Sequence, residues 1–149
     1  MRIDGRQIAV GSPPYVIAEI AGEHCGDVGR AFDLIKAAKD AGADAVKFQL
    51  YDPVKLAEAR GGRDKVLASG LWAGCSLGNL YAYAHTPKEW FPELFAYAKT
   101  QGIAAFASVF DIDGASYLYE LGCPAFKISS FELTDLALIR HIAGLYRPI

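Results

Sequence analysis

The strongest constraint on the fold is a unit that occurs three times along the chain. In each copy an amphipathic helix stops at a glycine, and a short apolar strand ending in polar residues follows. The copies are AFDLIKAAKDAGADAVKFQ, PELFAYAKTQGIAAFASVF and ASYLYELGCPAFKISS, with Gly42, Gly102 and Gly122 as the glycines. Glycine is favoured just past a helix because it adopts left-handed backbone angles without strain. The unit therefore predicts alternating helices and strands.

One strand precedes these units, in YVIAEIAG, and one helix follows them, in TDLALIRHIAG. Such alternation is typical of an α/β fold with parallel strands and right-handed crossovers. The expected strands lie near residues 15–20, 44–50, 103–108 and 124–129. Four units are half the number that close a (β/α)8 barrel, and the last residues, RPI, resemble the start of a fifth strand. The pattern alone leaves a doubly wound sheet and a barrel open.

Two local predictions concern the segment before the second repeated unit. In HTPKE, Thr86 is placed to cap a helix whose first residue is Pro87, with Glu89 completing a capping box. The stretch from Tyr51 to His85 is too long for a plain connection, and long loops after strands are usually functional or partly disordered.

Composition excludes several classes of function. The chain has 149 residues, 52% of them hydrophobic, with a formal charge of -2 and scattered Lys and Arg residues, so we expect no nucleic-acid partner. No apolar run approaches membrane-spanning length and the first residues do not resemble a signal peptide, so we expect a cytoplasmic protein without a membrane partner. Three cysteines without CxxC spacing argue against disulfides and structural zinc.

Polar groups recur at the carboxyl end of each expected strand. Residues two apart on a strand share a face, which pairs Ile17 with Glu19, Lys47 with Gln49, Phe106 with Ser108, and Lys127 with Ser129, with Ser130 just beyond. Ligands bind at this edge in parallel α/β folds. Two lysines with hydroxyls, an amide and a carboxylate suit a small anion such as a phosphorylated carboxylic acid. A structural Glu19–Lys47 salt bridge, or solvated strand ends, would explain the same residues.

Other candidate residues carry less weight. His24 follows the first strand, where it would contact substrate or only shape the turn. His85 and His141 are read as structural or solvated. A nucleophilic role for Cys25 lacks an orienting partner.

The stretches VIAEIAGEHCGDVGRAFDLIKAAKDAGADAVKFQ, HTPKEWFPELFAYAKTQGI, FASVFD and PAFKISSFEL together resemble the sialic acid synthase family. This family includes N-acetylneuraminate, legionaminate and pseudaminate synthases and spore-coat polysaccharide relatives. The resemblance implies a (β/α)8 barrel that condenses phosphoenolpyruvate with an N-acetylated sugar aldehyde and releases phosphate, using Mn²⁺ or Mg²⁺. Residues 1–149 would be the N-terminal half barrel of the synthase domain, its first four βα units, with no second domain.

By matching motifs, the resemblance implies roles for individual residues. Lys47 and Gln49 would contact the phosphoenolpyruvate carboxylate, and Ser108, Lys127 and Ser130 the phosphate. The remaining matches are Glu19 as the catalytic acid near the reacting centre, Glu132 with a substrate or structural role, and His24 as a substrate contact.

Several residues depart from the family pattern and affect these expectations. The usual NHNG turn is EHCG here, STPFD is ASVFD, and Phe131 replaces a glycine, changes that favour the spore-coat branch. The family's metal ligands lie on later strands, so we name none here. A half barrel leaves strand edges and an apolar face open, so we expect association with another copy or with the other half, and an inactive isolated chain.

Two other classes of function stay open at this point. One is a phosphate-binding aldolase in which Lys47 or Lys127 forms a Schiff base. The other is an inactive half-barrel fragment that serves only as an interaction or folding module.

Overall fold

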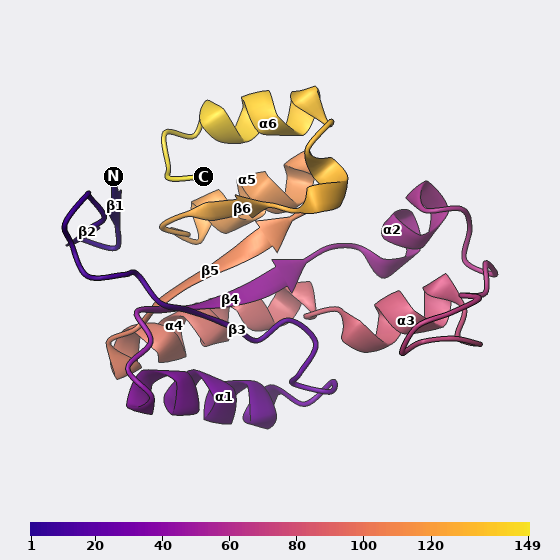
Figure 1. Cartoon of the computed structure of the whole chain (residues 1–149), viewed down its shortest axis with the longest axis horizontal. Helices are drawn as coiled ribbons and strands as arrows, with labels where there is room; N and C mark the ends of the chain where they lie inside the picture. The colour runs from indigo at the N-terminus through magenta and orange to yellow at the C-terminus, as the bar shows by residue number, and fades with distance from the viewer.

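A parallel sheet of four strands forms the centre of the computed structural model, which describes residues 1–149 (Figure 1). The strands lie side by side in the order in which they occur along the chain. They are β3 (Ile17–Glu19), β4 (Ala45–Leu50), β5 (Ala104–Val109) and β6 (Phe126–Ile128). This confirms the four predicted parallel strands. Beyond β6, the carbonyl of Pro148 accepts a hydrogen bond from the Phe126 amide at 2.9 Å, so the RPI stretch lies beside the sheet.

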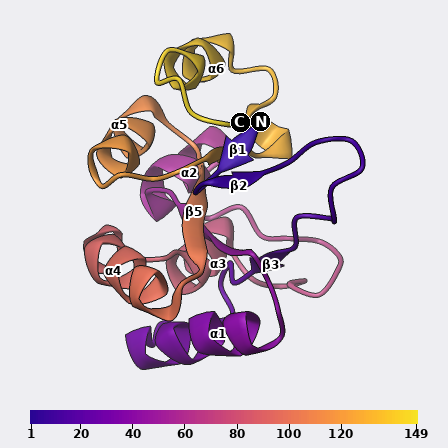
Figure 2. The same ribbon diagram turned by 90° about the vertical axis from the view of Figure 1, so that its left-hand side faces the viewer.

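Four helices cover one side of this sheet. They are α1 (Val28–Asp40), α4 (Phe91–Gln101), α5 (Ile112–Glu120) and α6 (Leu136–Ala143). Figure 2 looks along the strands and shows these helices as an arc on one side, with the opposite side left open. Figure 1 views that open side, with α4 and α5 behind the strands. None of the helices combines the length and hydropathy that crossing a bilayer requires.

The core lies between the sheet and this arc of helices. On β4, Val46 and Phe48 point toward the helices and are fully buried, as are Ile35 of α1 and Phe91 of α4. The rings of Phe48 and Phe91 meet edge to face, with centroids 6.1 Å apart. Full burial of each such side chain contributes roughly 1.5–3 kcal/mol. Alternation along each strand therefore assigns one face to the core and leaves the other face for different chemistry.

The turns at the carboxyl ends of the strands share one device, an aspartate that caps the next helix. Each carboxylate accepts hydrogen bonds from amides in the first turn, which satisfies donors that have no partner within the helix. The capping residues are Asp27 of α1, Asp52 of α2 (Pro53–Ala59), Asp111 of α5 and Asp135 of α6. These caps fix the loops at the edge where the sequence predicts a ligand.

The predicted capping box at Thr86 is wrong. The chain forms a short 3-10 helix, Lys88–Trp90, with no side-chain cap, and α4 begins only at Phe91. Thr86 is fully buried and its hydroxyl pairs with His24 instead, so tertiary packing overrides the local pattern. The predicted stop at Gly102 is confirmed, because this residue ends α4 with a left-handed φ of 67°.

Two regions contain structure that the pattern did not predict. The segment from Tyr51 to His85 holds α2 and α3 (Leu77–Ala84), with a bridge between Val66 and Ser76 linking its middle part. At the N-terminus, β1 (Arg2–Ile3) and β2 (Arg6–Gln7) form a hairpin. Its turn is Asp4-Gly5, with φ of 47° and 80°, which matches the Asp-Gly preference of tight hairpin turns.

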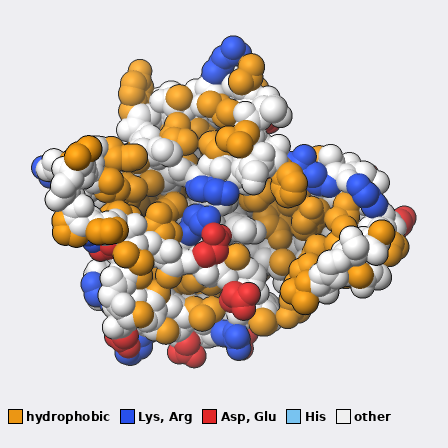
Figure 3. Space-filling view, in the orientation of Figure 1, with side chains coloured by type: hydrophobic (Ala, Val, Ile, Leu, Met, Phe, Trp, Pro, Cys, Tyr) orange, Lys and Arg blue, Asp and Glu red, His pale blue; other side chains and the backbone are white.

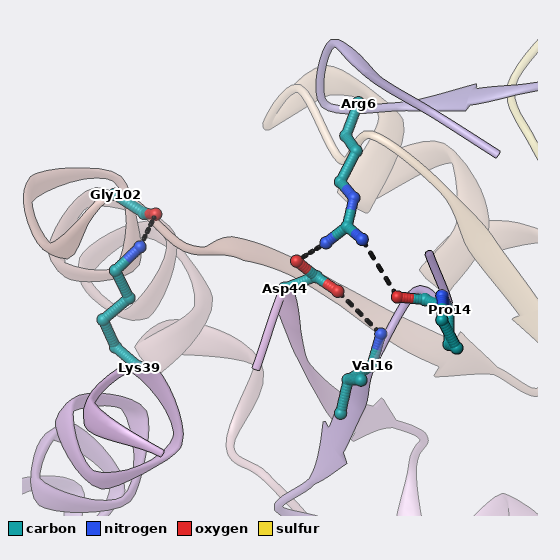
Figure 4. Close-up of polar contacts among 6 residues, drawn as sticks. All are labelled: Arg6, Pro14, Val16, Lys39, Asp44 and Gly102. Atoms are coloured by element: carbon teal, nitrogen blue, oxygen red, sulfur yellow. Dashed lines mark hydrogen bonds and ion pairs between the residues drawn. The ribbon is translucent and has the colours of Figure 1, made fainter. Parts of the chain in front are cut away.

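A group of polar contacts joins the hairpin to the amino-terminal edge of the sheet (Figure 4). The Asp44 carboxylate pairs with the Arg6 guanidinium and accepts the Val16 amide at 2.7 Å. Arg6 also donates to the Pro14 carbonyl at 2.9 Å. Nearby, the Lys39 ammonium donates to the Gly102 carbonyl at 2.7 Å and so ties α1 to the end of α4. Asp44 thus holds three separate segments together.

Replacing Asp44 with alanine is expected to lower the free energy of unfolding by about 1–3 kcal/mol, because Arg6 and the Val16 amide both lose their acceptor. Chemical denaturation measures this change. Asp40→Ala is the control, since its pair with Lys36 is exposed on α1 and its loss should be close to undetectable. Equal effects from the two substitutions would contradict this role for Asp44.

Candidate anion-binding face

The register of the strands places the predicted polar residues in two rows on the open face. Glu19 pairs with Lys47, and Lys47 pairs with Phe106, across β3, β4 and β5. One step toward the carboxyl edge, Gln49 pairs with Ser108 and Ser108 with Lys127, across β4, β5 and β6. Neighbouring strands are about 4.8 Å apart, so each row is a line of adjacent side chains. The sequence prediction that these residues share a face is confirmed.

Lys47 and Glu19 form an ion pair within the first row. The Lys47 Nζ lies 2.8 Å from a Glu19 carboxylate oxygen, with the lysine side chain 10% exposed and the glutamate side chain 50% exposed. Figure 3 shows basic and acidic side chains next to each other in the middle of this face, with hydrophobic side chains on either side. The lysine is thus oriented by a partner, while the glutamate still faces open space.

Ser108 is the unusual member of the second row. Its side chain is almost completely buried, yet its hydroxyl has no hydrogen-bond partner. A buried hydroxyl without a partner costs free energy, so such groups are rare and often have a functional reason. In the strand register, Ser108 lies between Gln49 of β4 and Lys127 of β6. This row therefore offers an uncommitted hydroxyl beside a cation.

Past the end of β6, Glu132 is held by two partners that the sequence did not single out for this role. Arg60, from the end of α2, donates to one of its oxygens, and the Ser129 hydroxyl donates to the other. Ser129 and Glu132 are buried, whereas Ser130, predicted to contact phosphate, is exposed. Arg60 lies 72 residues before Glu132, and no local pattern could pair them. Alternation did place Ser129 on the Lys127 face.

The environment of Glu132 changes its acidity. Burial raises the pKa of this carboxyl above its ordinary value, although the nearby Arg60 and Lys127 act in the opposite direction. The burial effect outweighs the two cations.

His24 does not reach the open face. Its ring is completely buried, with Nε2 3.2 Å from the Thr86 hydroxyl and Nδ1 accepting the Gly26 amide at 3.1 Å. It also meets Trp90 edge to face. Burial is the main cause that lowers the pKa of His24, followed by the charge of His85. These contacts shape the turn after β3, and a direct substrate contact stays a prediction.

A cavity of about 380 Å³ opens beside Glu132 at the carboxyl edge. It lies between α2 and the turns that follow β5 and β6. Aromatic rings and charged groups alternate on its walls, among them Tyr51, Lys55, Arg60, Phe110, Phe131 and Glu132. The long segment after β4 thus builds one wall of a hollow next to the polar rows.

The residues of this chain do not fit a divalent metal. No group of three or more His, Cys, Asp or Glu side chains is placed to hold one.

Comparison with known proteins identifies the family. Residues 34–149 match the model of the NeuB family, and the chain belongs to that family. It is 39% identical over 134 residues to the pseudaminic acid synthase of Campylobacter jejuni, covering 90% of this chain and 39% of that protein. It is 32% identical over 148 residues to the spore coat polysaccharide biosynthesis protein SpsE of Bacillus subtilis, covering 99% of this chain and 39% of that protein. These identities do not favour the spore-coat branch.

Solved structures support the fold class. The N-acetylneuraminic acid (sialic acid) synthetase of Leptospira borgpetersenii, solved in complex with citrate, superposes with a TM-score of 0.76 at 29% identity, covering 94% of this chain and 47% of that one. The four-stranded parallel sheet thus matches part of a NeuB-family barrel, as the sequence predicts. The chain spans about 39% of the length of the two curated relatives.

Ser108→Ala is expected to leave the free energy of unfolding unchanged or to raise it by up to about 1 kcal/mol, because the lost hydroxyl has no partner. Thr86→Val is the matched comparison. That hydroxyl is also buried but is bonded to His24, so its loss should cost about 1–3 kcal/mol. Thermal or urea denaturation distinguishes the two, and a large loss of stability in Ser108→Ala would contradict an uncommitted hydroxyl.

The buried, neutral His24 predicts a pH dependence of stability. Because its pKa is lower in the folded protein than in the unfolded chain, unfolding takes up a proton once the pH falls below about 6.5. The free energy of unfolding should therefore fall between pH 7.5 and pH 5, and less steeply in His24→Asn. Urea titrations across this range measure both slopes, and identical slopes would refute the assignment.

Proposed function

We propose that this chain belongs to a synthase that condenses phosphoenolpyruvate with an N-acetylated sugar aldehyde to form a nonulosonic acid. The observation that carries the proposal is the unpartnered hydroxyl of Ser108, set between Gln49 and Lys127 on the open face. A phosphate or carboxylate oxygen would accept a hydrogen bond from that hydroxyl and would lie against the ammonium groups of Lys47 and Lys127. Membership of the NeuB family and the 39% identity to a pseudaminic acid synthase support this reading.

The polar residues of the open face divide between the two charged ends of phosphoenolpyruvate. Lys47, oriented by Glu19, and Gln49 would hold the carboxylate. Ser108, Lys127 and Ser130 would hold the phosphate, to which lysine offers a point charge and serine a directed donor. Glu19 would lie near the reacting carbon, with half of its side chain still exposed. Direct contacts of His24 and Glu132 with substrate stay predictions.

The proposed reaction forms one carbon–carbon bond and breaks one bond to phosphate. The CH₂ carbon of phosphoenolpyruvate attacks the aldehyde carbon, whose oxygen gains a proton to become a hydroxyl. Water adds at the resulting cationic carbon, C2 of phosphoenolpyruvate, and phosphate departs as its bond to that carbon breaks, which leaves the 2-keto acid. Of the two protons that the water gives up, one goes to the aldehyde oxygen and the other to the phosphate. The residues of this chain contribute by fixing the nucleophile and by placing cations around its negative charge.

The open face of the sheet would be covered by further strands of a larger barrel domain. We assign residues 1–149 to the N-terminal portion of a barrel domain, in which further strands would continue beyond β6 and close over the open face. The exposed Ile17 and Ile149 side chains and the half-exposed Glu19 support a partner surface there. The cavity beside Glu132 is a place for the second substrate. A divalent metal, association with a second copy, and a cytoplasmic location stay predictions.

Phosphoenolpyruvate should bind this chain, and Lys47→Ala or Lys127→Ala should weaken binding by about 10- to 100-fold, the effect of losing one charge-assisted contact. Ser108→Ala should weaken binding by a smaller factor at unchanged stability. Isothermal titration calorimetry measures each dissociation constant.

Lys36→Ala is the control for these titrations, because this lysine is exposed on α1 and pairs only with Asp40. Its affinity should match that of the unsubstituted chain. Equal affinity in all four variants, or no binding by the unsubstituted chain, would contradict the proposed site.

A further inference from the structure

Arg60 connects two parts of the chain that are far apart in sequence. It ends α2, within the long segment after β4, and its guanidinium pairs with Glu132 in the turn after β6. The same guanidinium lies over the ring of Phe131, 4.7 Å from the centroid. Only one other ion pair joins α2 to a later part of the chain, between the exposed Lys55 and Asp113 at 4.0 Å. Arg60 is thus the main polar anchor of α2.

The two carboxylate oxygens of Glu132 accept hydrogen bonds from different parts of the chain. One oxygen accepts from Arg60 and the other from the Ser129 hydroxyl. Ser129 follows Lys127 by two residues, and Ser130 comes next. The turn after β6, which carries the proposed phosphate contact Ser130 and directly follows the strand that carries Lys127, is therefore bound through one carboxylate to α2. Substitution of Arg60 would remove its pair with Glu132 and so would affect the proposed phosphate contacts.

The charges around Glu132 make this carboxylate sensitive to Arg60. Burial alone favours its neutral form, Arg60 and Lys127 favour the ionised form, and Asp135 opposes ionisation. The remaining charged groups on the adjoining cavity wall are Asp52 and Lys55 of the α2 segment and Asp111 before α5. Without Arg60, Lys127 would be the cation still acting on an ionised Glu132, and that carboxylate would compete with the ligand for it.

We infer that Arg60 is a positioning residue, which acts through Glu132 to hold the turn after β6 in the geometry that presents Ser130 to the bound phosphate beside Lys127 of β6. This inference rests on the proposed function. It differs from the plain reading of the pair as a stabilising salt bridge, because it predicts that the neighbouring anion site depends on Arg60 and on pH. A salt bridge that only stabilised the fold would leave the affinity of the folded protein unchanged.

The test compares phosphoenolpyruvate affinity between pH 6 and pH 8.5 in the full chain and its variants. Arg60→Met should weaken binding by about 5- to 20-fold at pH 8, and the factor should shrink as the pH falls, because burial raises the pKa of Glu132 and protonation removes the charge that competes with the ligand for Lys127. Expressing each value relative to the unsubstituted chain at the same pH removes the titration of the ligand itself. Arg60→Lys keeps the cation and should restore affinity to within about threefold.

Two further variants control for the nonspecific loss of an arginine and for poor folding of Arg60→Met. Arg63→Met removes an exposed arginine three residues away and should leave affinity unchanged at every pH. In Arg60→Met/Glu132→Gln no unpaired carboxylate remains, so the pH dependence of the affinity ratio should disappear, even if Arg60→Met alone folds poorly. Hydrogen exchange gives an independent measurement, since amides of residues 54–59 and 129–132 should exchange faster in Arg60→Met than in Arg63→Met.

The outcomes separate the two levels of the proposal. If the unsubstituted chain binds no phosphoenolpyruvate, the proposed function fails, whatever Arg60 does. If it binds and the Arg60→Met ratio is the same at every pH, with unchanged exchange in residues 129–132, the positioning role is overturned while the proposed function stands.

Discussion

The parallel register between β4 and β5 is the constraint on which the rest of this structure depends. It aligns Lys47 with Phe106 and Gln49 with Ser108, and the flanking strands extend these pairs to Glu19 and Lys127. A slip of one residue would turn every side chain of a strand to the other face. Burial of Val46 and Phe48 against the helices prevents that slip. The hydrophobic core thus determines where the polar rows lie.

The two edges of the sheet differ in how far their polar groups are hydrogen-bonded. At the amino-terminal edge, Asp44 holds Arg6 and the Val16 amide, and every group in that cluster has a partner. At the carboxyl edge, the two buried side-chain atoms that lack a partner are the Ser108 hydroxyl and the Arg60 Nε. Unused hydrogen-bonding capacity is therefore concentrated at the carboxyl edge. This division fits a fold whose ligands bind at the carboxyl ends of its strands.

Much of this arrangement follows from local patterns. Alternation along each strand is enough to place Lys47, Gln49, Ser108 and Lys127 on one face, because the period of two is a property of the backbone. What local pattern could not give is contact between distant segments. Thr86 is a good helix cap by sequence but lies against His24, and Arg60 meets Glu132 across 72 residues. The Asp4-Gly5 pair, by contrast, is a local signal that is sufficient to predict the β1–β2 hairpin from sequence.

We propose that phosphoenolpyruvate binds the open face of the sheet and no other surface. Nuclear magnetic resonance of the isotope-labelled chain, titrated with phosphoenolpyruvate, would locate the binding surface residue by residue. The largest shifts should arise at Lys47, Gln49, Ser108, Lys127 and Ser130, with little change in α1 or in the β1–β2 hairpin. Shifts centred on the outer helices, or no shifts at millimolar ligand, would contradict it.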